Sequence, residues 1–456
     1  MKKIAITGAT GFIGQRLVKE LSRRGHALTA LTRSSAGATF PPEVTVKSCD
    51  LYSLKQIEQA VEGCDVAIYL VHSMLPTASL DQGSFADFDY ILADNFARAC
   101  ASANVKQIVY LGGIIPSGEH LSAHLASRQE VENILNSYPT PVKVLRAPMI
   151  LGDGGSSFQI MTKLVRRLPT MLCPTWTQSK SEPVAVNDVI EAIALCCEAE
   201  TPASKTYDIV GPHSFSYMEL MKLAAQEMGL KRRFIAIPYI PVELSRLWVT
   251  LITGAPYELV QPLTQSLTSD MLSDPDRRFP FPEGYVRRPI ADVIQESMRL
   301  EKRTVPRAFQ KMQLRRKTVR SIQRLPLPRG WSAQDVAEYY MEWLPKYFRV
   351  FISVNRKGDT VEFLLLRLKR MPLLILKFSP ERSTKNRPLF YVIGGLLGSR
   401  GEKGRLEFRA SYDQTFVLAA IHSFEPKLPW VVYRLTQAVA HQHVMHAFGR
   451  ALRTRS

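Results

Sequence analysis

The sequence predicts an α/β fold, in which a parallel sheet with helices on both faces is followed by a separate α+β domain. Strand-like and helix-like segments alternate over the first 150 residues, which is typical of parallel sheets. A glycine-rich stretch follows the first strand, and the composition becomes strongly basic after residue 300. A length of 456 residues predicts two or three domains, and 46% hydrophobic and 22% charged residues exclude a disordered or fibrous chain.

The alternating segments of the N-terminal part can be placed from their apolar patterns. We expect helices over 13–24 and 54–61, each with one apolar face. The run 66–71 is apolar throughout, as in a strand that is buried on both faces. Expected strands are 3–7, 27–32, 44–48, 66–71, 107–111 and 142–146. Alternation of this kind implies right-handed crossovers within one parallel sheet.

The pattern changes twice further along the chain. From 150 to 300 it loosens into helices and loops, with helices expected over 216–228 and 242–251. Residues 301–330 carry ten Lys or Arg and one acid, Glu301, so this stretch holds a net charge of +9 out of +18. We therefore expect a first domain over 1–300 with a small substrate-side subdomain, a basic linker over 301–330 and a C-terminal domain over 331–456.

The C-terminal domain reads as several strands between two helices. A helix is expected over 332–347 and a long closing helix over 429–452. Between them lie the strand candidates 361–368, 373–378, 389–393, 405–411 and 416–424. This order predicts an α+β domain.

The glycine-rich stretch between the first strand and the first helix predicts a dinucleotide site. Gly8 permits a tight turn, Gly11 lets backbone approach a pyrophosphate, and Gly14 lets the helix pack close to the strand. The phosphates would lie on free N–H groups at the start of the helix. The same stretch contains further candidate contacts to the cofactor, at Thr10, Phe12 and Ile13.

The end of the second strand favours NADP over NAD as the cofactor. NAD-binding chains usually place an acid there, whereas this chain has Arg33 followed by Ser34. Arg33 can form a forked contact with a 2′-phosphate, or it is simply a solvated surface residue. Asp50, followed by Leu51, comes after the third strand. Asp50 is a candidate contact to the adenine edge, and capping of the helix from 54 is its competing role.

On these residues the chain resembles the extended and atypical short-chain dehydrogenases/reductases over about residues 1–230. The glycine stretch carries the resemblance, together with Cys49-Asp50-Leu51, Leu145-Arg146-Ala147-Pro148 and the stretch 183–189. The resemblance implies a Rossmann-type NAD(P)-binding domain.

The catalytic signature of that superfamily is missing. The family uses a Tyr four residues before a Lys, with a Ser upstream. Alignment of the corresponding helix puts His124 at the Tyr position and Arg128 at the Lys position, with Gly112 where the Ser would be. His124 can transfer a proton or orient a substrate, whereas Arg128 can hold a ribose but cannot relay a proton. His124 and Arg128 are therefore the catalytic candidates, and the alternative is that both merely face solvent or cofactor on a helix.

Two more residues follow strands that pass the cofactor in this family. His72 ends the fourth strand, where a buried structural histidine is the alternative to a site residue. Gly112 would lie close to the nicotinamide, where the lack of a side chain suits backbone approach.

The C-terminal part resembles an uncharacterised domain of bacterial NAD(P)-binding proteins over about 345–456. The matching pieces include 390–397, 404–409 and 433–438. A sheet wrapped around a long C-terminal helix is similar to the START-like, helix-grip arrangement. That resemblance implies an interior that can hold an apolar ligand.

The basic linker leaves three possible partners. It carries one aromatic residue, Phe309, and no nucleic-acid motif, so nucleic acid is not expected. A solvated helix and attraction to anionic lipid are the other two interpretations. No metal is expected, because the histidines lack ligand spacing. We expect a cytoplasmic protein, with peripheral attachment at the inner membrane face left open.

Two functional hypotheses remain from the sequence. The first is an NAD(P)H-dependent oxidoreductase acting on a small apolar carbonyl or quinone-like compound. The second is a non-catalytic regulatory module that senses NADP. The cofactor stretch is compatible with both hypotheses, and the missing signature favours the second.

Overall fold

The computed structural model divides the chain into two compact units. The N-terminal unit comprises Met1–Leu75 and Asp89–Gln310, and the C-terminal unit comprises Pro76–Phe88 and Lys311–Ser456. The structure describes all residues except 34–38, 74–79, 117–120, 239–241, 258–259, 262–263, 265–266, 302–317, 350, 366–371, 399–403 and 456, and the side chains of 242–245 and 301. The boundary after residue 310 lies within the expected linker, and the inserted segment 76–88 was not expected.

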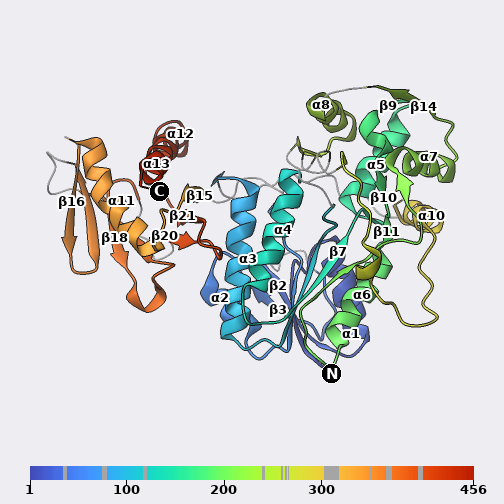
Figure 1. The fold of residues 1–456 in the computed structure, drawn as a ribbon, viewed down its shortest axis with the longest axis horizontal. Helices are drawn as coiled ribbons and strands as arrows, with labels where there is room; N and C mark the ends of the chain where they lie inside the picture. The colour runs from blue at the N-terminus through green and yellow to red at the C-terminus, as the bar shows by residue number, and fades with distance from the viewer. Residues whose placement is uncertain are drawn as a thin grey trace. The chain divides into compact units, whose positions relative to one another are not determined.

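A seven-stranded parallel sheet forms the centre of the N-terminal unit (Figure 1). Its strand order is β12-β7-β6-β4-β1-β2-β3, and every neighbouring pair is parallel. The strands are β1 (Lys3–Thr7), β2 (Ala27–Thr32), β3 (Thr45–Ser48), β4 (Val66–Tyr69), β6 (Gln107–Gly113), β7 (Val142–Ala147) and β12 (Lys205–Asp208). The predicted fold of this part is confirmed.

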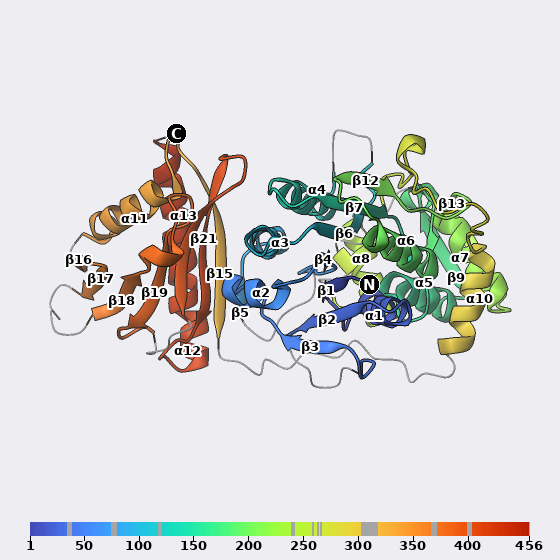
Figure 2. The ribbon, with the colours of Figure 1, turned by 90° about the horizontal axis from the view of Figure 1, so that it is seen from below.

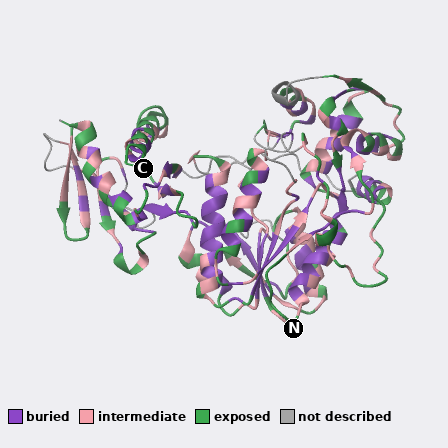
Figure 3. Cartoon of the chain, viewed as in Figure 1, coloured by how far each residue is buried: buried purple, intermediate pink, exposed green. Residues whose placement is uncertain are grey.

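Helices cover both faces of this sheet (Figures 1 and 2). On one side lie α2 (Leu54–Val61), α3 (Phe85–Ser102) and α4 (Ala123–Asn136), and on the other α1 (Phe12–Arg23) and α6 (Val186–Glu198). Helix α1 buries Leu17, Val18 and Leu21, and all four residues of β4 are buried, as the purple centre of the sheet shows in Figure 3. Burial on both faces explains why the central strands are apolar without alternation.

A second region of the N-terminal unit has its own apolar core. Its helices are α5 (Ser156–Arg167), α7 (Tyr217–Glu227), α8 (Val242–Thr253) and α10 (Ile290–Glu301), with the short helices η1 (Thr175–Gln178) and η2 (Pro275–Arg277). Its short strands are β8 (Ile150–Leu151), β9 (Thr170–Pro174), β10 (Lys180–Ser181), β11 (Val184–Ala185), β13 (Phe215–Ser216) and β14 (Arg233–Ile237). They pair as β10-β13, β11-β8 and β14-β9.

The C-terminal unit is built on an eight-stranded sheet in the order β16-β17-β18-β19-β20-β21-β15-β5. Its strands are β5 (Leu80–Gln82), β15 (Val319–Pro326), β16 (Ile352–Lys357), β17 (Thr360–Leu365), β18 (Pro372–Phe378), β19 (Leu389–Gly394), β20 (Arg405–Ala410) and β21 (Phe416–Phe424). Neighbours are antiparallel except β5, which pairs in parallel with β15. The edge strand β5 comes from the inserted segment 76–88.

The helices of this unit are α11 (Ala333–Phe348), α12 (Trp430–Leu435) and α13 (Gln437–Arg453), with the short helix η3 (Pro380–Arg382). The prediction of one long closing helix was wrong, because the helix breaks at Thr436, whose φ of −120° and ψ of −78° are not helical. The Thr436 hydroxyl donates to the carbonyl oxygen of Val432, a local bond that competes with helix geometry.

The prediction of a linker up to residue 330 was also wrong in part. Residues 302–317 lie outside the described residues, but Val319–Pro326 form strand β15. Burial of Val319, Ile322 and Leu325 in the sheet explains the strand. Arg320, within this strand, is buried and pairs with Asp81 at 3.4 Å, so it is not part of a solvated basic stretch.

Four charged or polar side chains gather inside the C-terminal sheet. Glu407 is buried between the guanidinium groups of Arg387 and Arg409, each 2.8 Å away, and His422 lies 3.1 Å from the same carboxylate. The two cations hold the pKa of Glu407 well below its usual range despite burial. Burial lowers the pKa of His422 to about 4, so this imidazole is neutral at neutral pH.

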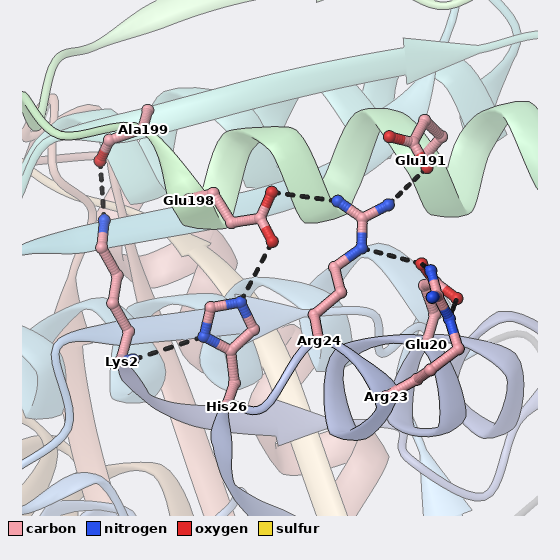
Figure 4. A network of polar contacts seen from close by, with 8 residues as sticks. All are labelled: Lys2, Glu20, Arg23, Arg24, His26, Glu191, Glu198 and Ala199. Atoms are coloured by element: carbon pink, nitrogen blue, oxygen red, sulfur yellow. Dashed lines mark hydrogen bonds and ion pairs between the residues drawn. The ribbon is translucent and has the colours of Figure 1, made fainter.

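An ion-pair network joins α1 to α6 on the face of the N-terminal sheet (Figure 4). Arg24 contacts Glu20 at 2.7 Å and Glu198 at 2.9 Å, and it also pairs with Glu191. The hydrogen bonds from Arg23 and Arg24 lower the pKa of Glu20 to about 2. Arg24 is 16% exposed, whereas its neighbour Arg23 is 72% exposed and forms an ion pair with Glu20.

The network predicts unequal effects for two adjacent arginines. Arg24→Met leaves three carboxylates without their shared cation, so we expect a loss of about 1–2 kcal/mol in the free energy of unfolding. Arg23→Gln is the matched control, and we expect it to change this free energy by less than about 0.5 kcal/mol. Urea denaturation of both variants measures the difference. Equal effects at both positions would show that the network adds no stability.

Candidate functional site

The turn between β1 and α1 lies where the order of the parallel sheet reverses. From β1 the chain continues to β2 and β3 on one side, while β4, β6 and β7 lie on the other. Parallel sheets bind ligands in the crevice at such a point, at the carboxyl ends of the strands. Thr7 joins the two central strands, because its hydroxyl donates to the Ile68 carbonyl at 3.0 Å and accepts from the Leu70 N–H at 3.1 Å.

Two glycines of the turn have no room for a side chain. Gly8 has a φ of +66°, and a Cβ there would lie 3.1 Å from the carbonyl oxygen of Leu70. A Cβ on Gly14 would lie 2.2 Å from the carbonyl oxygen of Gly8, so the helix packs directly on the turn. The predicted steric roles of Gly8 and Gly14 are therefore seen in the structure.

The first turn of α1 is open to an anion. Its N-cap, Gly11, supplies no side-chain hydrogen bond, and the turn contains no acidic residue. Thr10 and Gly11 are exposed, while Phe12 and Ile13 are half-buried against the core. Free N–H groups at a helix start attract phosphate, which agrees with a pyrophosphate at this position.

The candidate cofactor contacts at the ends of β2 and β3 differ in their exposure to solvent. Arg33 is exposed directly after β2, whereas Ser34 lies outside the described residues. Asp50 is half-buried and accepts the N–H of Tyr52 at 3.1 Å, while Leu51 is buried. The alternative of Asp50 as the cap of α2 was wrong, because Ser53 occupies the N-cap position.

The candidates at the ends of β4 and β6 are His72 and Gly112. His72 is exposed just beyond β4. Gly112 lies at the end of β6, where a Cβ would lie 2.9 Å from the ring of Tyr110. A serine at this position would require the buried Tyr110 ring to move.

Arg128 lies in a buried ion pair with Asp89 of α3. Asp89 also accepts the backbone N–H of Ser73 at 2.7 Å and the hydroxyl of Ser127 at 3.4 Å. The Tyr110 hydroxyl donates to the carbonyl oxygen of Arg128 at 3.3 Å. One guanidinium nitrogen of Arg128 is thus engaged by Asp89, and ribose binding by Arg128 stays a prediction.

His124, in the first turn of α4, faces a cavity of about 210 Å³. Ser122 caps this helix by accepting the N–H of Leu125 at 3.3 Å. Burial and the nearby charge of Arg128 lower the pKa of His124 to about 3. The imidazole is therefore neutral at neutral pH, so it can donate or accept a hydrogen bond but is not a reservoir of protons.

The cavity runs from the ends of β6 and β7 into the second region of the N-terminal unit. Its inner end includes Gly113 and Ala147, and the rest lies between α5, α7 and α8. Most of its lining is apolar, including Ile114, Leu125, Met149, Ile160, Met161, Leu164, Met171, Leu172, Met221, Trp248, Val249, Val260, Leu267 and Met271. Ser157, Thr177, Tyr217 and Thr264 add hydroxyls, of which Thr177 and Thr264 donate to backbone carbonyls.

Three residues of this region were missed from the sequence. Asp89 is a buried acid on an otherwise apolar helix face, a pattern that signals a buried cation partner. Tyr217 and Trp176 line the cavity from α7 and η1, and no local pattern places them there. Within the described part of the chain, the buried indole N–H of Trp176 has no hydrogen-bond acceptor.

Comparison with known proteins agrees with the geometry of the turn. Residues 8–148 match the NAD(P)H-binding family. This match contains the glycine turn, the end of β2 and both catalytic candidates. This match supports NAD(P)H binding by residues 8–148, and the parallel sheet of the N-terminal unit is of the Rossmann type, as predicted.

Several curated proteins are similar to about half of the chain. Ceramide reductase from Caulobacter vibrioides is 27% identical over 238 residues, which cover 52% of this chain and 73% of that protein. The mitochondrial NADH-ubiquinone oxidoreductase 40 kDa subunit from Neurospora crassa is 25% identical, covering 51% and 62%. A 2-alkyl-3-oxoalkanoate reductase from Stenotrophomonas maltophilia is 26% identical, covering 59% and 89%.

Solved structures share the fold of this part. Triphenylmethane reductase from Citrobacter sp. matches with a TM-score of 0.52 at 18% identity, covering 65% of this chain and 99% of that one. Its complex with NADP(H) matches with a TM-score of 0.50 at 16% identity, covering 64% and 99%. At these identities the comparison establishes the architecture alone.

Proposed function

We propose that the chain is an NADPH-dependent reductase of an apolar carbonyl or quinone-like compound. One observation carries the proposal: an apolar cavity opens at Gly113 and His124, beside the carboxyl ends of the strands that border the cofactor crevice. Apolar cavities with few polar groups are typical of small-molecule sites. Two of the relatives are named as reductases, which supports the reaction type.

In this reaction NADPH, when bound, supplies the hydride. His124 binds the carbonyl oxygen of the substrate by donating a hydrogen bond from its neutral imidazole. A donor aimed at an oxygen that gains negative charge stabilises the transition state, and one such donor accounts for roughly 10²–10³ in rate. Because the pKa of His124 is lowered to about 3, the proton that completes the reduction comes from water.

The surrounding residues hold His124 and select the substrate. Asp89 and Arg128 fix α4 from below, since Arg128 lies one turn after His124 on the same helix. The apolar lining excludes water from the reacting carbonyl. The indole N–H of Trp176 can donate to an additional oxygen on the substrate, which would satisfy a buried donor.

The cofactor proposed here is NADP rather than NAD. Arg33 is exposed at the end of β2, where it is accessible to a 2′-phosphate. The described part of this strand end has no acid to hold a ribose hydroxyl.

The second candidate is a non-catalytic NADP-sensing module. Two observations favour it: Arg128 is buried against Asp89, and the Tyr110 ring leaves no room for a side chain at position 112. Both candidates require NADP binding, so only turnover separates them.

We also propose that the C-terminal unit is START-like. From Val319 onward the described order is one strand, one helix, six antiparallel strands and closing helices, as expected for a helix-grip arrangement. The space between α11, α13 and the sheet is filled by aromatic rings, with Tyr340 5.6 Å from Phe408 and 5.0 Å from Phe448 between centroids. A ligand of this unit would therefore require these rings to move.

Turnover with a panel of apolar carbonyl compounds tests the proposed function. We expect NADPH oxidation with medium-chain ketones, aldehydes or quinones, and none with polar sugars, because the cavity lining is apolar. Full-length protein is mixed with NADPH and each compound, and the loss of NADPH absorbance is followed. NADPH binding without oxidation by any compound would favour the sensing module.

Two substitutions of His124 test its role once a substrate is found. We expect His124→Phe to keep its affinity for NADPH and to lower kcat by roughly 10²–10³. His124→Gln keeps an N–H donor and should retain more activity. Since the pKa of His124 lies near 3, wild-type kcat should not fall as the pH rises through 6.5. If wild-type kcat does fall as the pH rises through 6.5, and His124→Gln abolishes this fall, then His124 acts as a proton donor.

The cofactor preference is tested at Arg33. We expect wild-type protein to bind NADPH more tightly than NADH, and Arg33→Asp to reverse this order, because the acid repels a 2′-phosphate and accepts a ribose hydroxyl. Fluorescence titration with both cofactors gives the dissociation constants. The exposed Lys19→Gln, on α1, is a control for loss of positive charge. Equal wild-type affinities would argue against Arg33 as the determinant.

A further inference from the structure

Helix α8 carries apolar side chains on two opposite faces. Trp248 and Val249 line the cavity, while Leu247 and Leu251 are 61% and 83% exposed. On a surface helix, the side chains that face solvent are normally polar. In Figure 1, α8 lies at one end of the N-terminal unit, near β9 and β14.

A second exposed apolar pair lies on the strand pair β9-β14. Leu172 and Ile235 are register partners and are 50% and 47% exposed. Leu172 also lines the cavity. Thus two elements of the cavity wall each present large apolar side chains to the outside.

Basic side chains gather at the C-terminal end of α5, between these elements. Arg167 donates to the carbonyl oxygen of Ile252 in α8, and Arg232 donates to the carbonyl oxygens of Val165 and Arg166 at 2.7 and 2.9 Å. Lys231 and Arg233 flank Arg232 and are exposed. The stretches 154–178 and 229–240 together contain six Lys or Arg and no acid.

Exposed leucines beside cations have the chemistry of an anionic lipid surface, and the basic stretches 154–178 and 229–240 contain no acid. Helix α8, which carries Leu247 and Leu251, contains one acid, Glu243, and one arginine, Arg246. The apolar side chains can enter the boundary between head groups and acyl chains. Each basic residue near such a surface adds attraction, so several act together. Among the described residues, no helix is long and apolar enough to cross a membrane, so this contact would be peripheral.

We propose that this surface docks on anionic membranes. We call it the α5-end surface, and it consists of Arg166, Arg167, Lys231, Arg233, Leu172, Ile235, Leu247 and Leu251. A second part of the inference rests on the proposed function. In it, the apolar substrate leaves the lipid, passes α8 and enters the cavity that Trp248 lines. The docking itself does not require catalysis.

Sedimentation with vesicles tests the docking. Full-length protein is mixed with vesicles of phosphatidylcholine alone or with about one-third phosphatidylglycerol, at low and high salt. We expect binding to the anionic vesicles that weakens at high salt, because ions screen the attraction. Lys231→Gln with Arg233→Gln should weaken it about 30-fold. Leu247→Ser with Leu251→Ser should weaken it at both salt concentrations.

Matched variants decide whether this surface is responsible. Lys19→Gln with Lys55→Gln removes two exposed charges from α1 and α2 and should leave binding within about twofold. A triple variant, Arg315→Gln with Arg316→Gln and Lys317→Gln, tests the basic stretch that lies outside the described residues. Equal losses from the Lys19 and Lys55 pair, loss only from the 315–317 variant, or no vesicle binding by the wild type would each overturn the proposal.

Turnover separates this proposal from the proposed function. The Leu247→Ser, Leu251→Ser protein should reduce a detergent-dispersed substrate at the wild-type rate, and lose activity about tenfold or more only when the substrate is embedded in vesicles. If the protein binds vesicles but shows no turnover, the docking proposal is supported and the proposed reductase function is contradicted. If the protein shows turnover but does not bind vesicles, the reductase function is supported and the docking proposal is contradicted.

Discussion

The buried ion pair between Asp89 and Arg128 determines the arrangement of the candidate site. Two charges buried this deeply are tolerated only when they pair and their remaining atoms find partners. Asp89 therefore also accepts the N–H of Ser73, and the carbonyl of Arg128 accepts the Tyr110 hydroxyl. These bonds connect α3, α4, the segment after β4 and the end of β6. His124 occupies its place at the cavity because α4 is held at this point.

The three departures from the usual dehydrogenase signature are physically connected. The guanidinium of Arg128, at the Lys position, pairs with Asp89, and its charge also lowers the pKa of His124. The ring of Tyr110, which approaches Arg128, occupies the space that a side chain at Gly112 would need. The buried ion pair and the Tyr110 ring thus lie next to the positions where the chain departs from that signature.

Features that depend on a local sequence pattern were predicted from the sequence, whereas features that depend on contacts between residues distant in the chain were missed. Helix α2 was predicted at its observed bounds because its apolar face repeats regularly, and the glycine turn was placed because its steric needs are local. The partner of Arg128 was missed because the residue was compared with a family position, without knowledge that Asp89 lies opposite. The cavity could not be foreseen, since its lining comes from six or more elements brought together only by folding.

The same reasoning explains why the end of the linker was misplaced. A basic composition suggested a solvated linker up to residue 330, yet Val319, Ile322 and Leu325 are buried in β15. This strand is covered on its other side by β5, only three residues long and contributed by the segment 76–88. An uncovered edge strand exposes unpaired backbone groups. The C-terminal sheet is therefore completed by a piece of chain that lies between β4 and α3 in sequence, and residues 311–456 alone would lack it.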